Sequence, residues 1–529
     1  MSSPAPPPRA RLSRALVVVA AIAGIAPLFM GRHLPMADLP EHVAAMATMR
    51  HYWDASFRAH EYFQLARVYE TSYFLYQAVG AALSVVTGSA ERANLVMMAL
   101  VGLGYTFSLR ALLAALRRDT RLAVLGPALF WTQNLTVGLL NFVASVPVVL
   151  FALASAVAYT KRPTRRRAVV LGLLSVAILY LHVSSFLLFV AEALALALLA
   201  EDALPTSREA LFRRVACVPR RVVWLAPSLA LGAIVALGGR TGAGDGHASG
   251  LHYEPRLALL AQIPHWLFDN FRTRIDDVLG LVVVATLLVL TGIGVGRLAR
   301  PSQLPRARVV RPLVMAALAW VFVLAMPTRA GAYAFLLDVR MSVYVGAFAL
   351  LLPTPSFRKV TRPLHAVVAA ATLGLMANVA YEVRAFERDD VGAFDDLLRK
   401  MPRGARLLSL DYAKYSSRTN ASVLHHFGSY YRARYGGIAS FSFSEMPHWP
   451  VRYRPEWSPP QRMTFGNPNV FDPERDGAYF DFVLVHGDAR PLDGAAMARW
   501  EVIGVARGFR LYRKLGPEEA KAQAALRSL

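Results

Sequence analysis

The residues of this chain that are best suited to chemistry stand together near its N-terminus. Asp38 and Glu41 supply two carboxylates and His42 supplies an imidazole, all within residues 38–42. The preceding apolar run, residues 15–30, predicts a first membrane-spanning helix. A carboxylate at a membrane boundary is partly desolvated, so its pKa should rise into the range useful for a general base. Residues 38–42 therefore form a candidate catalytic segment.

The same segment also fits an ordinary structural role. Asp38 could cap a helix, with Pro40 in the first turn and Glu41 facing the positive end of the helix macrodipole. Apolar residues between 43 and 53 recur at helical spacing, which predicts an amphipathic helix lying in the membrane interface. The position of the carboxylates at the membrane boundary favours the catalytic interpretation.

Four further candidates stand at the outer ends of predicted spans. Asn141 and His182 lie at the turns of two uncharged hairpins, and Asp338 and Arg340 precede a later span. A lone interfacial histidine is commonly satisfied by a neighbour, and Asp338 could simply pair with Arg340. In the functional alternative these polar groups line a cavity. The planar guanidinium of Arg340 would then bind a lipid phosphate.

The composition indicates the environment that must hold these side chains. Only 18% of the 529 residues are charged and 55% are hydrophobic, whereas soluble proteins are about one quarter charged. Long uncharged runs recur over the first 380 positions or so, which predicts a polytopic α-helical membrane protein. The net charge of +23 comes largely from arginines between these runs, as expected for cytoplasmic loops rather than for nucleic-acid binding. Cys217 is the only cysteine, so no intramolecular disulfide can form.

The basic clusters also predict the topology. Placing all of them in the cytoplasm gives about eleven spans, with the N-terminus inside and the C-terminus outside. Large outer loops then cover residues 31–70 and 240–277. The uncharged segment 71–90 disturbs this alternation, so we interpret it as a re-entrant or in-plane helix, with a full span as the alternative.

Two domains follow from this pattern. Residues 1–381 form the membrane domain, and residues 382–529 form an extracytoplasmic α/β domain. The expected elements of the second domain are a helix at 391–400, strands at 405–410 and 482–486, and a terminal hairpin at 500–505 and 509–513.

With these residues placed, the chain resembles the GT-C superfamily of membrane glycosyltransferases, which includes protein O-mannosyltransferases and aminoarabinose transferases. The resemblance covers the whole architecture. In sequence it rests on four short motifs: 38–42, 138–142, 180–182 and 338–341.

The resemblance implies inverting transfer of a sugar from a polyprenyl-phosphate donor to an outer-face glycan, lipid or protein acceptor. Asp38 matches the first-loop carboxylate that acts as the family's general base, with Glu41 as second choice and His42 beside them. Asn141, His182, Asp338 and Arg340 would bind substrate, with Arg340 on the leaving phosphate. No cofactor is certain, and a divalent cation (Mg or Mn) stays open. The expected location is the bacterial inner membrane, among membrane lipids and without nucleic acid.

Two other functions fit the same residues. A transporter or flippase-like protein would use the polar span ends as a substrate path. However, transporters commonly carry inverted repeats and broken helices at mid-membrane, and no half-to-half similarity is visible in this chain. A non-catalytic partner in envelope polysaccharide assembly is the second alternative.

Overall fold

The computed structural model describes residues 8–201, 203–241, 250–298, 306–331, 334–353, 358–413, 415–460, 468–492 and 499–527. They form two compact units. Unit 1 comprises residues 1–30, 98–135 and 141–381, and unit 2 comprises residues 31–97, 136–140 and 382–529. Much of the predicted outer loop 240–277 is described, but residues 242–249 lie outside the described ranges.

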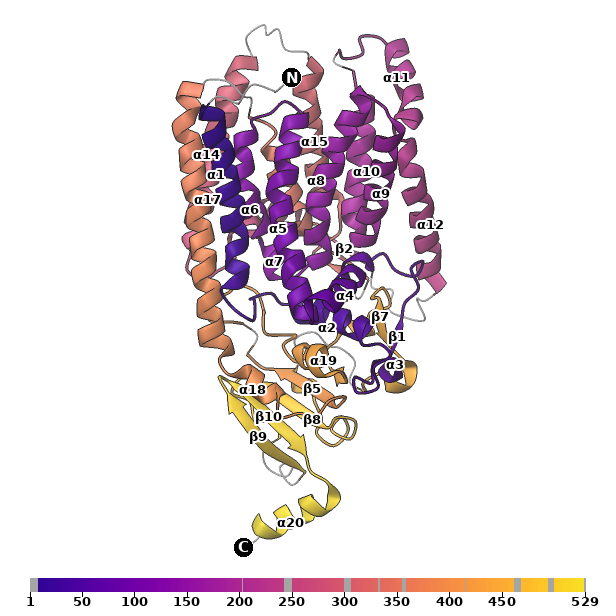
Figure 1. The fold of residues 1–529 in the computed structure, drawn as a ribbon, viewed down its shortest axis with the longest axis vertical. Coiled ribbons are helices and arrows are strands. Elements are labelled where there is room, and N and C mark those ends of the chain that lie inside the picture. Colours follow the sequence, from indigo (N-terminus) through magenta and orange to yellow (C-terminus); the bar gives the residue numbers. More distant parts are fainter. Residues whose placement is uncertain are drawn as a thin grey trace. The chain divides into compact units, whose positions relative to one another are not determined.

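Unit 1 is almost entirely helical, and Figure 1 shows its helices running roughly side by side. Its main helices are α1 (Pro8–Ile25), α5 (Ala90–Ala115), α6 (Gly126–Phe130), α8 (Leu140–Lys161), α9 (Arg165–Leu181), α10 (Val183–Leu198), α11 (Arg208–Arg221), α12 (Ala226–Thr241), α13 (Arg256–Phe268), α14 (Ile275–Leu298), α15 (Arg306–Ala325), α16 (Ser342–Ala349) and α17 (Arg358–Phe386). Most residues of α5, α8 and α17 belong to unit 1, and one end of each belongs to unit 2. Three two-residue strands form a small sheet: β2 (Leu251–His252), β3 (Arg329–Ala330) and β4 (Ala334–Phe335).

The long apolar helices identify a membrane protein, as the composition predicted. Among the described residues, four helices are long and apolar enough to cross a membrane, or five if the bent pair formed by α11 and the segment 223–237 is one span. Five other apolar helices are shorter, from 10 to 17 residues. The expected eleven spans therefore stay a prediction.

Two predicted hairpins have different outcomes. The turn at His182 is confirmed: α9 ends at Leu181, α10 begins at Val183, and His182 between them is extended, with φ −163° and ψ 123°. The uncharged stretch 122–160, with Asn141 at its turn, was expected to form the other hairpin. Its second leg is α8, but its first is broken into a 3-10 helix, η2 (Thr120–Leu125), and the five-residue α6. Pro127 at the start of α6 lacks the N–H that a continuous helix needs.

Unit 2 is built on a five-stranded mixed sheet of order β6-β5-β8-β10-β9. The strands are β5 (Arg406–Asp411), β6 (Ile438–Ala439), β8 (Phe482–His486), β9 (Trp500–Ala506) and β10 (Phe509–Lys514). β5 runs parallel to β6 and β8, and β10 pairs antiparallel with β8 and β9. The predicted strands and the terminal hairpin are therefore confirmed, and α18 (Phe394–Leu398) lies within the predicted helix.

Both faces of this sheet are buried. Neighbouring residues of a strand point to opposite sides of the sheet, so each strand contributes to two separate apolar clusters. Leu407, Leu484 and Leu511 pack in one apolar cluster with α18. Leu408 and Val483 pack in the other with Trp500 and Tyr512.

The first outer loop packs on the C-terminal sheet region instead of standing alone. Strand β1 (Phe63–Leu65) pairs antiparallel with β7 (Val451–Tyr453), so that Phe63 lies opposite Tyr453. An apolar cluster joins Tyr62 and Phe63 to Trp449 and Val451. The compact units therefore group residues 31–97 with 382–529, whereas the sequence was divided in chain order at residue 381.

Helix α2 (Leu39–Arg50) corrects one expectation. Residues 39 to 48 are all buried, and α2 packs against α4 (Leu75–Thr87) and α19 (Ser429–Tyr435) within unit 2. It is therefore not an interfacial helix with one apolar face. The alanines at 44, 45 and 47 allow neighbours to approach the side that was expected to be polar. α4 itself has 13 residues, fewer than the roughly 20 that a full span needs, which favours the re-entrant or in-plane interpretation.

Candidate functional site

Asp38 occupies the N-cap position of α2, but its side chain makes no capping hydrogen bond. Its backbone N–H donates to the carbonyl of Val137 at 3.1 Å. Gly138 has φ +88°, and a Cβ there would lie 2.5 Å from the Asp38 nitrogen. The segment 136–140 therefore holds the Asp38 backbone closely. The carboxylate keeps 18% of its side-chain surface exposed, with Oδ1 3.8 Å from Nε2 of His426.

Glu41 has the opposite environment, because it is fully buried and its carboxylate is surrounded by donors. Arg432 donates to Oε2 at 3.1 Å, the Ser442 hydroxyl at 2.8 Å and the backbone N–H of Phe443 at 2.9 Å. The Ser429 hydroxyl donates to Oε1. Such a network fixes the carboxylate in place and joins α2 to the C-terminal part of unit 2.

His42 is buried in an aromatic shell, with ring centroids 5.2 Å from Trp449 and 5.7 Å from Tyr76. The Gln77 amide lies 3.0 Å from Nδ1, and the backbone of Gly138 also forms a hydrogen bond with the ring. Burial lowers the pKa of His42 to about 4. The imidazole is therefore neutral at neutral pH.

The four predicted binding residues lie in unit 1, where two of them meet. Arg340 donates from Nη1 to Nε2 of His182 at 3.1 Å and from Nη2 to the carbonyl of Phe335 at 2.7 Å. Asp338 accepts from the backbone N–H of Val339 at 2.7 Å and from the Thr328 hydroxyl. Asp338 thereby holds the short helix η4 (Val339–Met341) that carries Arg340.

Asn141 is buried in the first turn of α8. Its neighbour in the same sequence motif, Phe142, packs edge-on against the His182 ring at 5.1 Å. Asn134, from the preceding turn, donates to the backbone carbonyl of Arg340 at 3.3 Å. Two segments predicted to turn at the membrane boundary therefore approach the His182–Arg340 pair.

Titratable residues that were not candidates from the sequence follow from His426, whose Nε2 lies 3.8 Å from Asp38. His486 Nδ1 lies 2.8 Å from Oδ1 of Asp411, and His425 Nδ1 lies 3.7 Å from Oδ2 of the same carboxylate. The rings of His425 and His426 meet edge to face at 4.8 Å. The one signal in the sequence for the Asp411–His486 contact is that each residue stands at the end of a predicted strand.

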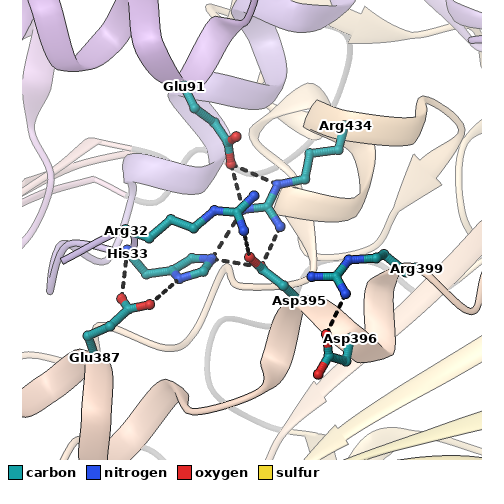
Figure 2. Close-up of polar contacts among 8 residues, drawn as sticks. All are labelled: Arg32, His33, Glu91, Glu387, Asp395, Asp396, Arg399 and Arg434. Carbon is teal, nitrogen blue, oxygen red and sulfur yellow. Dashed lines mark hydrogen bonds and ion pairs between the residues drawn. The ribbon is translucent and has the colours of Figure 1, made fainter.

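A charged cluster that also escaped sequence analysis surrounds His33, and Figure 2 shows it between Glu387 and Asp395. Nδ1 lies 3.2 Å from Glu387 and Nε2 lies 3.0 Å from Asp395. Arg434 donates to Glu91 at 2.8 Å and pairs with Asp395. Burial opposes protonation, but the hydrogen bonds to Asp395 and Glu387 raise the pKa of His33 above its usual value.

The residues described by the structure include no group of three or more His, Cys, Asp or Glu side chains arranged to hold a metal ion. The carboxylates nearest Asp38 and Arg340 are instead engaged by Arg, Ser, Thr and backbone donors. Metal dependence stays an open expectation.

The fold defines a polytopic membrane protein with a carboxylate-bearing first loop that packs on a C-terminal sheet region. This architecture is similar to that of a solved GT-C glycosyltransferase, the arabinofuranosyltransferase AftD from Mycobacteria. The two share 14% sequence identity with a TM-score of 0.52, over 96% of this chain and 40% of the AftD chain. A mutant AftD structure gives 15% identity and a TM-score of 0.47, over 94% of this chain and 41% of that one.

The resemblance inferred from the motifs is thus confirmed at the level of the fold. This chain spans less than half the length of the AftD chain. No protein-family model and no curated protein matches the sequence.

Proposed function

We propose that this protein is a membrane glycosyltransferase that moves a sugar from a polyprenyl-phosphate donor to an acceptor on the outer face of the bacterial inner membrane. Asp38 is the general base. The observation that carries the proposal is the contrast inside α2. Glu41 and His42 are buried and engaged, while Asp38 keeps a partly exposed carboxylate that does not cap the helix.

The chemistry follows from this carboxylate. Asp38 removes the proton from an acceptor hydroxyl as the oxygen attacks the anomeric carbon of the donor sugar. The bond from that carbon to the phosphate oxygen breaks, and its electron pair leaves with the polyprenyl phosphate. A single displacement of this kind inverts the configuration at the anomeric carbon. Glu41, which accepts four donors, serves to fix α2.

On the donor side, we propose that Arg340 neutralises the phosphate and that His182 orients Arg340. The guanidinium is held from two sides, by His182 and by the Phe335 carbonyl. A preorganised guanidinium stabilises developing phosphate charge without reorganising during the reaction. Asp338 and Asn141 support the same region, through η4 and the first turn of α8.

The test is sugar transfer by the purified protein in lipid, with a panel of polyprenyl-phosphate sugars, for wild type and Asp38→Asn. Removing a general base should lower turnover by about 10²- to 10⁴-fold, with donor binding retained. Asp396→Asn is the matched control, because Asp396 is an exposed carboxylate of the same unit, 59% exposed and paired with Arg399.

Turnover of Asp38→Asn that matches the Asp396→Asn control would refute the assignment of the base. Absence of turnover in the wild type, with donor lipid still bound, would favour a transporter or a non-catalytic partner. Movement of the donor across proteoliposomes would then separate these two.

A further inference from the structure

Four side chains of unit 2 follow one another from Asp38 and are here called the histidine row: His426, His425, Asp411 and His486. His426 Nε2 lies 3.8 Å from Asp38, and the two histidine rings touch edge to face. His425 lies 3.7 Å and His486 2.8 Å from the Asp411 carboxylate. The series starts at the proposed base and ends at His486, whose side chain is 12% exposed.

The sheet explains why the far end of the row exists. β5 and β8 are adjacent parallel strands in register, so their last residues, Asp411 and His486, stand opposite each other. The carboxyl ends of parallel strands are where α/β sheets commonly place functional side chains. His486 is fixed by stacking on Phe509 of β10 at 4.4 Å. The pair Asp411–His486 is therefore built by the fold and does not depend on a surface loop alone.

The environment of His426 suits a neutral imidazole. It is buried, and its ring is hydrogen-bonded to the backbone of Phe441 and packed edge-on against Phe443 at 5.1 Å. The titratable and charged groups that face it are Asp38 from α2, His425, Asp411 from β5 and Arg432 from α19. Burial, and then the neighbouring His425, lower the pKa of His426 well below its usual value.

We propose that the histidine row receives the proton that Asp38 takes from the acceptor, with His426 positioning the Asp38 carboxylate and accepting its proton first. This inference rests on the proposed function. Such a path would return Asp38 to its ionised form inside the protein, while bound substrate covers the part of the carboxylate that is exposed in the free protein.

The steps balance without any further reactant. After transfer, the Asp38 O–H bond breaks and a lone pair of the His426 ring forms the new N–H bond. His426 then loses a proton to His425, and Asp411 stabilises the resulting imidazolium, because a carboxylate 3.7 Å away favours the charged ring. His425 next gives its proton to the Asp411 carboxylate, a lone pair of the His486 ring takes it from Asp411, and the partly exposed His486 releases it to water. The 3.8 Å separation at Asp38 need only shorten slightly, since catalytic hydrogen bonds often tighten once substrate binds.

The first experiment is chemical rescue. His426→Ala removes the first proton acceptor, so kcat should fall by about tenfold or more, while KM for donor and acceptor changes less than twofold. Added imidazole should restore kcat in proportion to its neutral fraction. Asp411→Asn should lower kcat without rescue by imidazole. His60→Ala, an exposed histidine of the same unit, should change nothing and is the control.

A second readout needs no turnover. In ¹⁵N-histidine NMR of the full chain in lipid nanodiscs, Asp38→Asn should shift the ring signals of His426. Asp411→Asn should shift the ring signals of His425 and His486, which both face this carboxylate. If Asp38→Asn leaves the His426 ring signals unchanged, the proposed proton path is wrong. An unchanged kcat in His426→Ala would refute it as well. If Asp38→Asn abolishes transfer while His426→Ala is fully active, the proposed function stands and only this inference fails.

Discussion

Asp38 and Glu41 stand three positions apart in the sequence, yet the fold gives them different tasks. Glu41 is fully buried and paired with Arg432, whose side chain is 1% exposed. A buried ion pair costs desolvation, but breaking it leaves an uncompensated charge. Asp38 differs from Glu41 in its burial, because 18% of its side-chain surface stays exposed. A substitution at each position should therefore affect a different property.

Glu41→Gln should destabilise unit 2 by about 3 to 5 kcal/mol, because Arg432 loses its buried partner. Asp38→Asn should cost less stability than Glu41→Gln, because the Asp38 carboxylate is partly exposed and the Glu41 carboxylate is fully buried. The measurement is thermal unfolding of both variants in detergent or nanodiscs. A Glu41→Gln protein with wild-type unfolding temperature and no transfer activity would make Glu41, rather than Asp38, the base.

His33 gives a second prediction at the residue scale, and its sign follows from its raised pKa. The protonated ring is favoured in the folded state by Asp395 and Glu387. This contribution is fully present below the unfolded pKa, near 6.5, and is lost as pH rises through the higher folded pKa. His33→Gln should therefore cost roughly 2 kcal/mol at pH 6 and less at pH 9. The free energy of unfolding is measured for wild type and His33→Gln at both pH values, with His60→Gln as control. An equal loss of stability at pH 6 and pH 9 would contradict the prediction.

At the scale of elements, the segment 136–140 fixes the start of α2. Gly138 has a positive φ and approaches Asp38 so closely that no side chain fits between them. Gly88 also has a positive φ, of +83°, but a Cβ there would meet only the end of the flexible Arg92 side chain, at 3.9 Å. Substituting each of these two glycines therefore distinguishes two effects: backbone strain, which both substitutions cause, and displacement of Asp38, which only the substitution at Gly138 causes.

Gly138→Ala and Gly88→Ala should both lose about 1 to 2 kcal/mol, the cost of placing an L-residue in the left-handed region. Only Gly138→Ala should also lose sugar transfer, because its methyl group displaces Asp38. Unfolding and transfer assays on both variants provide the comparison. Equal transfer by the two variants would show that the close approach at Gly138 has no role in catalysis.

At the scale of the whole molecule, the packing of residues 31–97 on 382–529 has a direct consequence for fragments. Tyr62 and Phe63, which the tail needs to cover Val451 and Trp449, come from the first loop. A fragment of residues 382–529 alone should therefore expose this apolar surface and aggregate. Linking residues 31–97 to it should give a folded, soluble unit with dispersed amide NMR signals. A well-dispersed spectrum from 382–529 alone would contradict this prediction.

Local signals in the sequence predicted individual elements well. The uncharged runs around His182 specify two helices and the turn between them, and the apolar run 482–486 specifies β8. The contacts of the candidate site were not predictable, because they join distant residues: Glu41 and Arg432 are 391 positions apart. No periodicity encodes such a pairing. The amphipathic interpretation of α2 failed for the same reason, since the partner that buries its second face, α19, lies almost four hundred residues away.

The pairing of β1 with β7 also sets the order in which the protein can mature during synthesis. Strand β1 leaves the ribosome long before its partner exists, since β7 begins at Val451. At 5–20 residues per second, the chain between residues 65 and 451 takes roughly 20 to 80 seconds to translate. During that interval Tyr62, Phe63 and the side of α2 that packs on α19 lack their C-terminal partners. The nascent protein should therefore need a holding chaperone for its first loop until its final segment has been made.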